Sequence, residues 1–187
     1  MRCIFVLLVL ALLPAAAQKP LTRDLRDQSL APYVSSPQPI VDRMLDMAGV
    51  KPGETVYDLG CGDGRILITA AKRYKAKGVG IELSDKLVKM TGDQIKRLEL
   101  GDQITIRQGH LLHVDLSPAD VVTLYLETSS NEMLRPNLEK YLKPGARVVS
   151  HDFEIRGWKP VKVERIMAFN RDHTIFLYLI PVSLKKK

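Results

Sequence analysis

A strand-like segment followed at once by three alternating glycines constrains this chain more than any other feature of its sequence. The segment Thr55–Leu59 is mostly apolar, and glycines stand at positions 60, 62 and 64. Glycine adopts positive φ angles without strain, so this run permits a tight turn whose bare main chain a ligand can approach. A helical pattern begins at Arg65. This order predicts a ligand-binding loop at the carboxyl end of a strand in a parallel sheet.

Strand-like and helix-like patterns alternate along most of the chain. Helices are expected over residues 39–48, 65–74, 87–100 and 134–142, and strands over residues 55–59, 78–82, 104–106, 119–126, 147–150, 161–168 and 173–180. The alternation indicates βαβ units, and therefore an α/β fold with a mostly parallel sheet covered by helices on both faces. Only residues 169–172 separate the last two strands, which predicts an antiparallel C-terminal hairpin. The 187 residues allow one domain of ordinary size, assigned to residues 38–182.

The first 17 residues have the layout of a secretory signal peptide. Arg2 supplies a positive start, residues 4–13 are apolar, and Ala15–Ala17 form a small-residue cleavage signal. The apolar run is shorter than the roughly 20 residues of a comfortable transmembrane helix. A cleaved leader is favoured, and a short retained membrane anchor stays open. The expected location is therefore exported or membrane-associated.

Two further terminal segments are expected to lie outside the folded domain. Residues 18–37 are polar and contain three prolines, which predicts an arm with little regular structure, and residues 183–187 form a basic tail. The net charge of +7 permits an anionic partner without requiring one. Aromatic residues make up only 6% of the chain, so a stacking platform for single-stranded nucleic acid is disfavoured.

Acidic residues around the glycine loop favour a cationic ligand. Asp58 precedes the loop and Asp63 lies within it, where their charges would repel a pyrophosphate. The G-x-G-x-G spacing also differs from the dinucleotide fingerprint G-x-G-x-x-G, although a dinucleotide stays possible on these residues alone. Glu82 closes the second strand, where a carboxylate can accept hydrogen bonds from ribose hydroxyls. S-adenosylmethionine, with its sulfonium and α-ammonium groups, fits this combination.

The segment Asp58–Gly64 resembles motif I of the class I S-adenosylmethionine-dependent methyltransferases. Residues 32–37, 120–126 and 147–153 are similar to segments of the small protein-lysine methyltransferases typified by the mitochondrial ATP synthase c-subunit methyltransferase and its archaeal relatives. The resemblance implies a Rossmann-like fold with a seven-stranded sheet, S-adenosylmethionine as cofactor and a protein lysine as acceptor. It also implies a set of cofactor-binding residues: Tyr33, Asp58, Gly60, Cys61, Gly62, Asp63, Glu82, His110, Leu111 and Tyr125.

One position departs from the pattern of the superfamily. Members often carry an acidic residue after the third strand that accepts a hydrogen bond from the adenine amino group, and this chain has His110 there. A neutral imidazole can accept that bond through its unprotonated nitrogen. Cys61, inside the loop, is interpreted as a small residue that packs under the turn rather than as a nucleophile.

Polar residues at the ends of the fourth and fifth strands are the candidates for the acceptor side. Tyr125, Glu127 and Asp152 are the predicted catalytic residues, with Glu127 or Asp152 orienting an amine or passing its proton to water. Asn131 is a further candidate for the acceptor site, and His151 is interpreted as a hydrogen-bonded strand end. No spacing of His and Cys suggests a metal site.

Three functions remain open at this level. A protein-lysine methyltransferase is favoured, and the alternatives are a small-molecule methyltransferase and a non-catalytic nucleoside-binding module. The absence of an Asn-Pro-Pro-Tyr type signature argues against a nucleobase acceptor. Because S-adenosylmethionine is made in the cytosol, a membrane anchor that leaves the domain facing the cytosol would solve the problem of cofactor supply.

Overall fold

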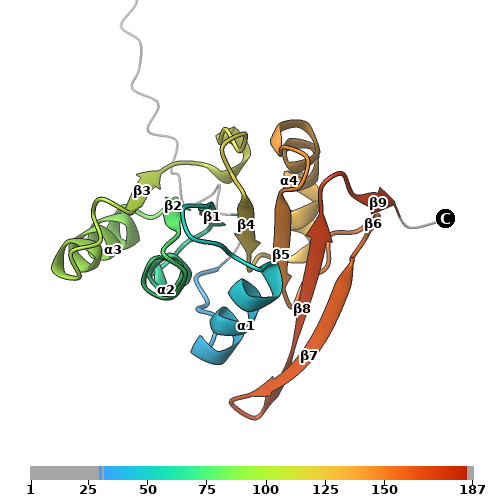
Figure 1. Cartoon of the computed structure of the whole chain (residues 1–187), viewed down its shortest axis with the longest axis horizontal. Helices are drawn as coiled ribbons and strands as arrows, with labels where there is room; N and C mark the ends of the chain where they lie inside the picture. The colour runs from blue at the N-terminus through green and yellow to red at the C-terminus, as the bar shows by residue number, and fades with distance from the viewer. Residues whose placement is uncertain (1–29, 31, 185–187) are drawn as a thin grey trace, which may run out of the picture.

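A seven-stranded sheet with helices on both faces organises the computed structural model, which describes residue 30 and residues 32–184 (Figure 1). The strand order is β3-β2-β1-β4-β5-β8-β7, in which β1 to β5 run parallel to one another and β8 is antiparallel to both of its neighbours. The strands are β1 (Thr55–Leu59), β2 (Lys77–Glu82), β3 (Ile104–Gln108), β4 (Val121–Leu124), β5 (Arg147–His151), β7 (Lys162–Ala168) and β8 (Arg171–Leu179). The helices are α1 (Gln38–Ala48), α2 (Arg65–Tyr74), α3 (Asp85–Arg97), α4 (Thr128–Tyr141) and the 3-10 turn η2 (Leu111–His113).

The predicted α/β architecture with a C-terminal antiparallel hairpin is confirmed, and the differences lie at the ends of elements. The fourth strand covers only Val121–Leu124, because the Ala119 N–H is held in a turn by the Leu116 carbonyl and the chain leaves the sheet after Leu124. The third helix begins two residues earlier than expected, where Ser84 caps it by accepting a hydrogen bond from the Leu87 N–H. A small second sheet, β6 (Trp158–Lys159) with β9 (Ser183–Leu184), was not expected from the sequence.

Two apolar clusters fill the space between the sheet and its helices. On one face α1 and α2 pack their buried side chains against β1 and β5, and Ile95 of α3 joins this cluster. On the other face α4 and η2 pack against the opposite sides of the same strands. Alternation along β5 sends Val149 to the α1 side and Val148 to the α4 side, so the central strands are buried on both faces.

Gly80 lets the glycine loop pack onto the neighbouring strand β2. A Cβ at this position would lie 2.6 Å from the Cys61 sulfur, 2.7 Å from Ile106 Cδ1 and 2.9 Å from Leu67 Cδ1. The Cys61 side chain therefore occupies the space that any larger residue at position 80 would need. The contact between the Cys61 side chain and Gly80 therefore sets how closely the glycine loop packs against β2.

The segment before α1 lies on the carboxyl edge of the sheet. Leu30 packs beside the α4-side cluster, and its carbonyl accepts a hydrogen bond from the Ser130 hydroxyl. Residues 32–37 are without regular secondary structure, as predicted for the end of the arm. The predicted leader (residues 1–17), most of the arm and the last three residues of the basic tail lie outside the described residues. Within the described part of the chain, every helix is too short or too polar to cross a bilayer.

Candidate active site

Asp58 is a buried carboxyl at the point where β1 gives way to the glycine loop. It is 3% exposed, and its Oδ1 accepts a hydrogen bond of 2.8 Å from the Thr123 hydroxyl on the adjacent strand β4. Burial raises the pKa of Asp58 to about 7, the charges of Asp63 and Glu82 add to the rise, and the Thr123 hydrogen bond opposes it. A cation placed against this carboxyl would favour its ionised form.

The loop glycines adopt backbone conformations that other residues rarely reach. Gly60, Gly62 and Gly64 have φ angles of +84°, +52° and +73°. A Cβ on Gly62 would meet the ring of Tyr33 at 2.5 Å, and one on Gly64 would meet Thr91 Cγ2 at 2.6 Å. The loop is therefore bare main chain with the Tyr33 ring lying against it.

Glu82 holds the loop and the end of β2 together. Its Oε2 accepts a hydrogen bond from the Gly62 N–H at 3.0 Å, and its Oε1 accepts from the N–H groups of Leu83 and Ser84 at 2.9 Å each. These bonds fix the orientation of the carboxylate, and Oε2, which accepts only one of them, has a further lone pair for a ribose hydroxyl. Glu82 thus has the position expected of a ribose-binding acid, and its role stays a prediction.

Asp63 connects the loop to the segment before α1 through Arg65. The Arg65 guanidinium donates to both carboxylate oxygens of Asp63 and, through Nη1, to the Ser36 carbonyl at 2.9 Å. Burial opposes ionisation of Asp63, but the hydrogen bonds and charge of Arg65 outweigh it and lower the pKa of Asp63. Partial burial first, and then the Asp63 charge, raise the pKa of the Tyr33 hydroxyl.

The His110 ring does not offer the free acceptor nitrogen that the sequence analysis expects for an adenine amino group. Its Nδ1 accepts a hydrogen bond of 3.2 Å from the Leu112 N–H, so the unprotonated nitrogen of the neutral ring is already in use. The Nε2 therefore carries the proton and can donate, but it cannot accept from an adenine amino group. The next residue, Leu111, is 7% exposed and packs in the α4-side cluster.

Cys61 packs under the loop, as the sequence interpretation held. The side chain is 4% exposed, and burial together with the Asp58 charge strongly raises the pKa of the thiol. The thiolate that nucleophilic chemistry needs is thereby disfavoured.

Tyr125, Asp152 and Arg171 meet at the carboxyl ends of β4 and β5. The Tyr125 hydroxyl lies 3.5 Å from Asp152 Oδ2, and Arg171 Nη2 lies 3.3 Å from the same hydroxyl and donates to the same carboxylate oxygen. The other oxygen of Asp152 accepts from the Thr174 N–H at 2.9 Å. Burial and the Asp152 charge raise the pKa of Tyr125, which keeps the phenol protonated at neutral pH.

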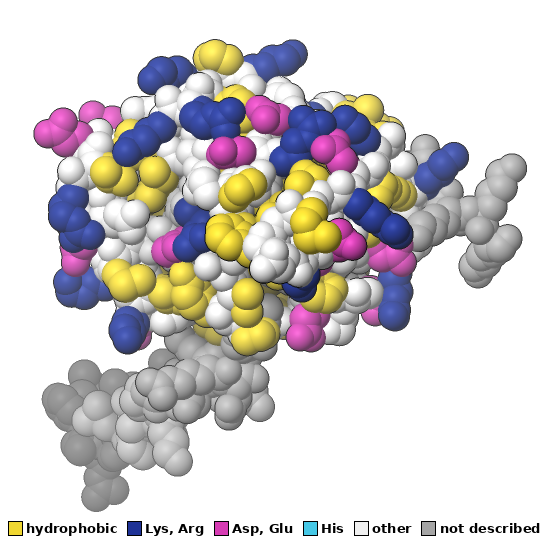
Figure 2. Space-filling model, turned by 90° about the horizontal axis from the view of Figure 1, so that it is seen from below, with side chains coloured by type: hydrophobic (Ala, Val, Ile, Leu, Met, Phe, Trp, Pro, Cys, Tyr) yellow, Lys and Arg dark blue, Asp and Glu magenta, His cyan; other side chains and the backbone are white. Residues whose placement is uncertain are grey.

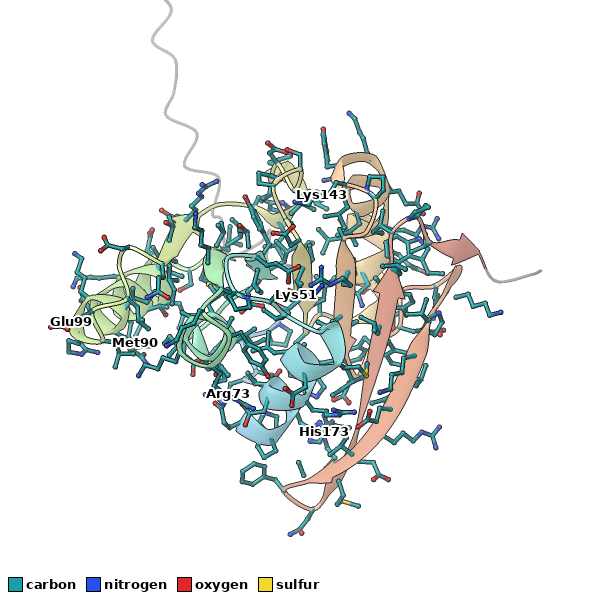
Figure 3. The ribbon with its side chains drawn as sticks, in the orientation of Figure 1. Lys51, Arg73, Met90, Glu99, Lys143 and His173 are labelled. Atoms are coloured by element: carbon teal, nitrogen blue, oxygen red, sulfur yellow. The ribbon has the colours of Figure 1, made fainter. Side chains whose placement is uncertain are left out.

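A buried chain of hydrogen bonds runs behind Tyr125. The Tyr125 ring stacks on His151 with ring centroids 3.9 Å apart. His151 contacts Ser36 Oγ through Nδ1 at 2.8 Å and His173 Nδ1 through Nε2 at 2.8 Å. His173 lies on β8, near the lower edge of the sheet in the view of Figure 3.

Proton positions along this chain follow from Arg171, which can only donate. Because Arg171 Nη2 also lies 3.0 Å from His173 Nδ1, that nitrogen is an acceptor, and His151 Nε2 must carry the proton that joins the two rings. His151 Nδ1 then accepts from the Ser36 hydroxyl. Burial lowers the pKa of His151 to about 4, against the opposing charge of Asp152, so its ring is neutral at pH 7.

Glu127 and Asn131 lie at the start of α4. Glu127 is exposed, and no described residue donates a hydrogen bond to its carboxylate. Asn131 is fully buried and its amide donates to the Phe153 carbonyl at 3.2 Å, so it stabilises the segment that follows β5. Of the three predicted catalytic residues, the structure brings Tyr125 and Asp152 together, and no hydrogen bond between described residues links Glu127 to either.

The cluster of His151, Asp152 and His173 also has the donor types of a metal site. One ligand atom from each lies within 4.8 Å of the others. The Arg171 guanidinium contacts two of these three atoms, so a fixed positive charge already stands where a metal ion would bind.

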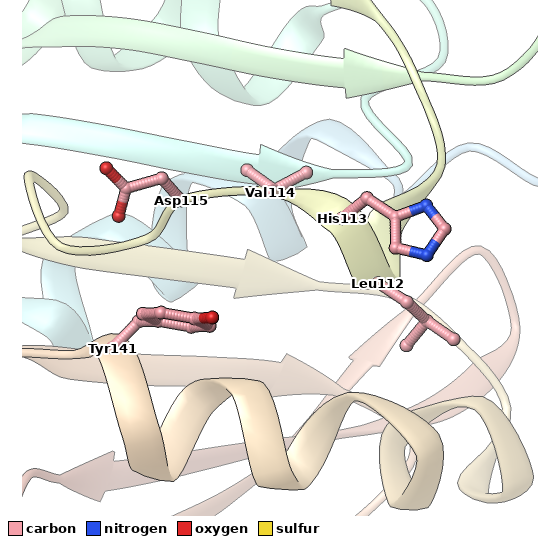
Figure 4. A pocket seen from close by; sticks show the side chains of 5 residues that line it. All are labelled: Leu112, His113, Val114, Asp115 and Tyr141. Carbon is pink, nitrogen blue, oxygen red and sulfur yellow. The ribbon is translucent and has the colours of Figure 1, made fainter.

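A separate pocket of about 350 Å³ lies between η2 and the C-terminal end of α4 (Figure 4). Asp115 and Tyr141 face each other across it, and Leu112, His113 and Val114 complete its lining. None of the acidic residues of the glycine loop takes part. This pocket adjoins the segment after His110 and is not the place where the candidate site residues gather.

Taken together, the sheet order, the antiparallel β8 and the acidic glycine loop after β1 define a class I S-adenosylmethionine-dependent methyltransferase. More particularly, the chain belongs to the family of the ANTKMT methyltransferase domain, whose model matches residues 58–162.

The relatives agree with this assignment. A protein of Saccharolobus islandicus (strain REY15A) named protein-lysine N-methyltransferase is 49% identical over 80% of this chain and 93% of its own length. The adenine nucleotide translocase lysine N-methyltransferase of Mus musculus is 31% identical, and the alignment covers 74% of this chain and 62% of the mouse protein. A solved structure described as an RNA methyltransferase from Salinibacter ruber in complex with S-adenosyl-L-homocysteine is 44% identical, with a TM-score of 0.75, and the alignment covers 82% of this chain and 98% of that one.

Proposed function

We propose that this protein transfers a methyl group from S-adenosylmethionine to a lysine side chain of a protein. The observation that carries the proposal is the 49% identity, over nearly the whole length of the relative, to a protein named protein-lysine N-methyltransferase. The mouse relative also bears the name of a lysine methyltransferase.

The residues on the donor side suit this cofactor. The bare glycine loop admits a ligand to the main chain, Glu82 presents an oriented carboxylate to a ribose, and Asp58 offers a buried partner for a positive group. No Lys or Arg neutralises Asp58 among the hydrogen bonds and ion pairs of the described residues, whereas Asp63 is paired with Arg65. The site thus carries negative charge that a cationic cofactor would balance.

The bound cofactor supplies an activated methyl group on a sulfonium. The protein must align the acceptor nitrogen with that methyl group and exclude water, and such positioning is worth about 7–11 kcal/mol. A lysine must first lose its proton, which desolvation promotes by lowering its pKa. Asp152 and Tyr125 are the groups at this edge of the sheet that can hold the nitrogen while it does so.

An RNA acceptor is the second candidate, because the Salinibacter ruber relative is described as an RNA methyltransferase. Phosphate backbones are bound by contiguous positive surfaces. The face at the carboxyl ends of the parallel strands instead mixes Lys and Arg with Asp and Glu around apolar side chains (Figure 2). This distribution favours a protein acceptor over RNA.

Transfer of a labelled methyl group to a whole-cell extract, membranes included, tests the proposal. Label on protein lysine, located by mass spectrometry, is the expected result. Label confined to RNA or to small molecules would overturn the lysine acceptor, and binding of cofactor without any transfer would indicate a non-catalytic module. Asp58→Ala is expected to abolish labelling. Asp102→Ala, a change in the exposed turn between α3 and β3, serves as the matched control.

We further propose that the N-terminal segment exports the protein or associates it with a membrane, and that a retained anchor leaves the methyltransferase domain on the cytosolic side. The apolar run of residues 4–13 and the cytosolic supply of S-adenosylmethionine support this proposal. Mass spectrometry of the intact protein from its native membranes distinguishes the possibilities. A mature chain that begins at Met1 supports the anchor, and one that begins at Gln18 would refute it in favour of a cleaved leader.

A further inference from the structure

We propose that Asp152, Tyr125 and His173 form the binding site for the ammonium group of the acceptor, and that Arg171 occupies this site as an internal plug until the acceptor displaces it. The inference rests on the proposed function and names the part of the site that recognises the substrate. It assigns a role to Arg171 and His173, which the sequence did not single out as site residues.

Three hydrogen-bond acceptors converge on one nitrogen of Arg171. Nη2 contacts Asp152 Oδ2, the Tyr125 hydroxyl at 3.3 Å and His173 Nδ1 at 3.0 Å. The acceptors come from three elements, since Asp152 follows β5, Tyr125 follows β4 and His173 lies in β8. The fold thus builds a cluster of acceptors around a single cationic nitrogen.

A lysine ammonium can replace the guanidinium in this cluster. The single lone pair of His173 Nδ1 is shared between the His151 Nε2–H and Arg171, so Asp152 Oδ2 and the Tyr125 hydroxyl are the acceptors with capacity of their own. A lysine ammonium carries three N–H donors and no acceptor, so it can bond to both of these groups with one N–H remaining. The cluster is therefore satisfied by an ammonium as fully as by its present occupant.

The charge of the cluster also requires a cation. Asp152 is 14% exposed and supplies one negative charge, while the phenol of Tyr125 and the ring of His151 behind it are neutral at pH 7. A carboxylate buried to this extent is costly to leave unpaired. A neutral side chain cannot replace Arg171 here without that cost, whereas a lysine can.

Arg171 is placed so that it can leave without disturbing the fold. It is the first residue of β8, directly after Phe169 and Asn170, which form the hairpin turn, and its side chain is 55% exposed. Arg147 shows the contrast. Its side chain is 17% exposed and donates to Glu54 and to the Ala48 carbonyl, as expected of a structural arginine.

The cluster lies beside the donor half of the site. Asp58 at the end of β1 bonds to Thr123 of β4, and Tyr125 follows two residues later on the same chain segment. Each methyl group added to the acceptor nitrogen removes one N–H donor. Affinity for the cluster therefore falls once fewer than two N–H donors remain, which favours release of the multiply methylated product.

Direct binding of a small alkylammonium tests the plug without relying on methyl transfer. We would titrate n-butylammonium chloride into the full-length protein and follow binding by NMR. Arg171→Ala is expected to bind the probe about tenfold or more tightly than the wild type, a gain of about 1.4 kcal/mol. Arg165→Ala, which removes an exposed arginine from the same hairpin, is the matched control and should bind as the wild type does.

Two further measurements make the test specific. Adding Asp152→Asn to Arg171→Ala should abolish the gain, and n-butyltrimethylammonium, which has no N–H donor, should show none. Thermal melting identifies any variant that fails to fold, in which case Arg171→Gln replaces it. Equal affinity of Arg171→Ala and wild type, an equal gain in Arg165→Ala, or a gain that persists with Asp152→Asn would overturn the proposal.

The outcome is separable from that of the proposed function. Lysine labelling in extract without a gain in Arg171→Ala would refute the plug and leave the lysine acceptor standing. The predicted gain without any labelled lysine would support the ammonium site and refute the protein-lysine acceptor.

Discussion

Replacing Asp58 by asparagine is expected to stabilise the cofactor-free protein in a way that depends on pH. The pKa of Asp58 rises from 3.8 to about 7 on folding, mainly because the carboxyl is buried. A group whose pKa is raised in the folded state contributes stability at low pH that is lost as the pH rises from its unfolded pKa to its folded one. For Asp58 this window runs from 3.8 to about 7.

The magnitude follows from the shift. A rise of about three units corresponds to about 4 kcal/mol, because each unit is worth about 1.4 kcal/mol. Asparagine has nearly the same shape, keeps an acceptor for the Thr123 hydroxyl and carries no charge. We therefore expect Asp58→Asn to exceed the wild type in free energy of unfolding by up to about 4 kcal/mol at pH 8 and by little at pH 4. Urea denaturation across this pH range measures the difference.

Cofactor binding supplies the second half of the same test. Part of the free protein carries the Asp58 proton near neutral pH, and a cation bound against the carboxyl would expel it. Calorimetric titration of S-adenosylmethionine in two buffers of different ionisation enthalpy should therefore report proton release from the wild type and none from Asp58→Asn. A stability difference that does not change with pH, or equal proton release from both proteins, would refute the reasoning.

Three further predictions concern packing and charge. Gly80→Ala is expected to destabilise the fold by about 1–3 kcal/mol, because the added Cβ overlaps the Cys61 sulfur and Ile106. Chemical denaturation measures the loss. Gly92→Ala is the control, since nothing lies within 4 Å of a Cβ at position 92. Cys61 should react with a thiol reagent only after unfolding, since the thiol is 4% exposed and its pKa is strongly raised; rapid labelling of the native protein would contradict this. Arg147→Met should cost about 1.5–3 kcal/mol of stability, because it removes the charged partner of Glu54 and leaves that carboxylate only the Lys51 N–H. Restoration of stability by Glu54→Gln in the same chain would identify the ion pair as the cause.

The cofactor-binding residues of the site are predictable from sequence because each lies next to a local pattern, the carboxyl end of a strand. Asp58 is the second-last residue of β1 and Glu82 is the last residue of β2, and the carboxyl ends of parallel strands meet at one edge of the sheet. The sequence pattern of strand, glycine turn and helix therefore predicts that both carboxylates lie at this edge. Their assigned roles in cofactor binding stay predictions, and the Asp58→Asn experiment addresses one of them.

The acceptor half was less accessible to sequence reasoning. Ser36 bonds to His151 across 115 positions of the chain, and no local pattern encodes such a partner. Arg171 reaches Asp152 only because β8 runs antiparallel beside β5, which returns its first residues to the carboxyl edge. His151 was interpreted as a strand end, and the structure adds that it is fully buried between Ser36 and His173. The two-residue strands β6 and β9 were missed because so short a pairing has no periodicity to detect.

Ser36 is held from two directions, and this has a consequence for the order in which ligands bind. Its carbonyl accepts from Arg65, which also grips the glycine loop through Asp63, while its hydroxyl donates to His151 behind Tyr125. Ser36 is therefore linked both to the glycine loop, through Arg65, and to the residues on the acceptor side. If bound cofactor orders Ser36, it also orders the acceptor side, and linkage requires each substrate to raise the affinity for the other by the same factor. The enzyme can therefore bind its two substrates cooperatively without any movement of the sheet between them.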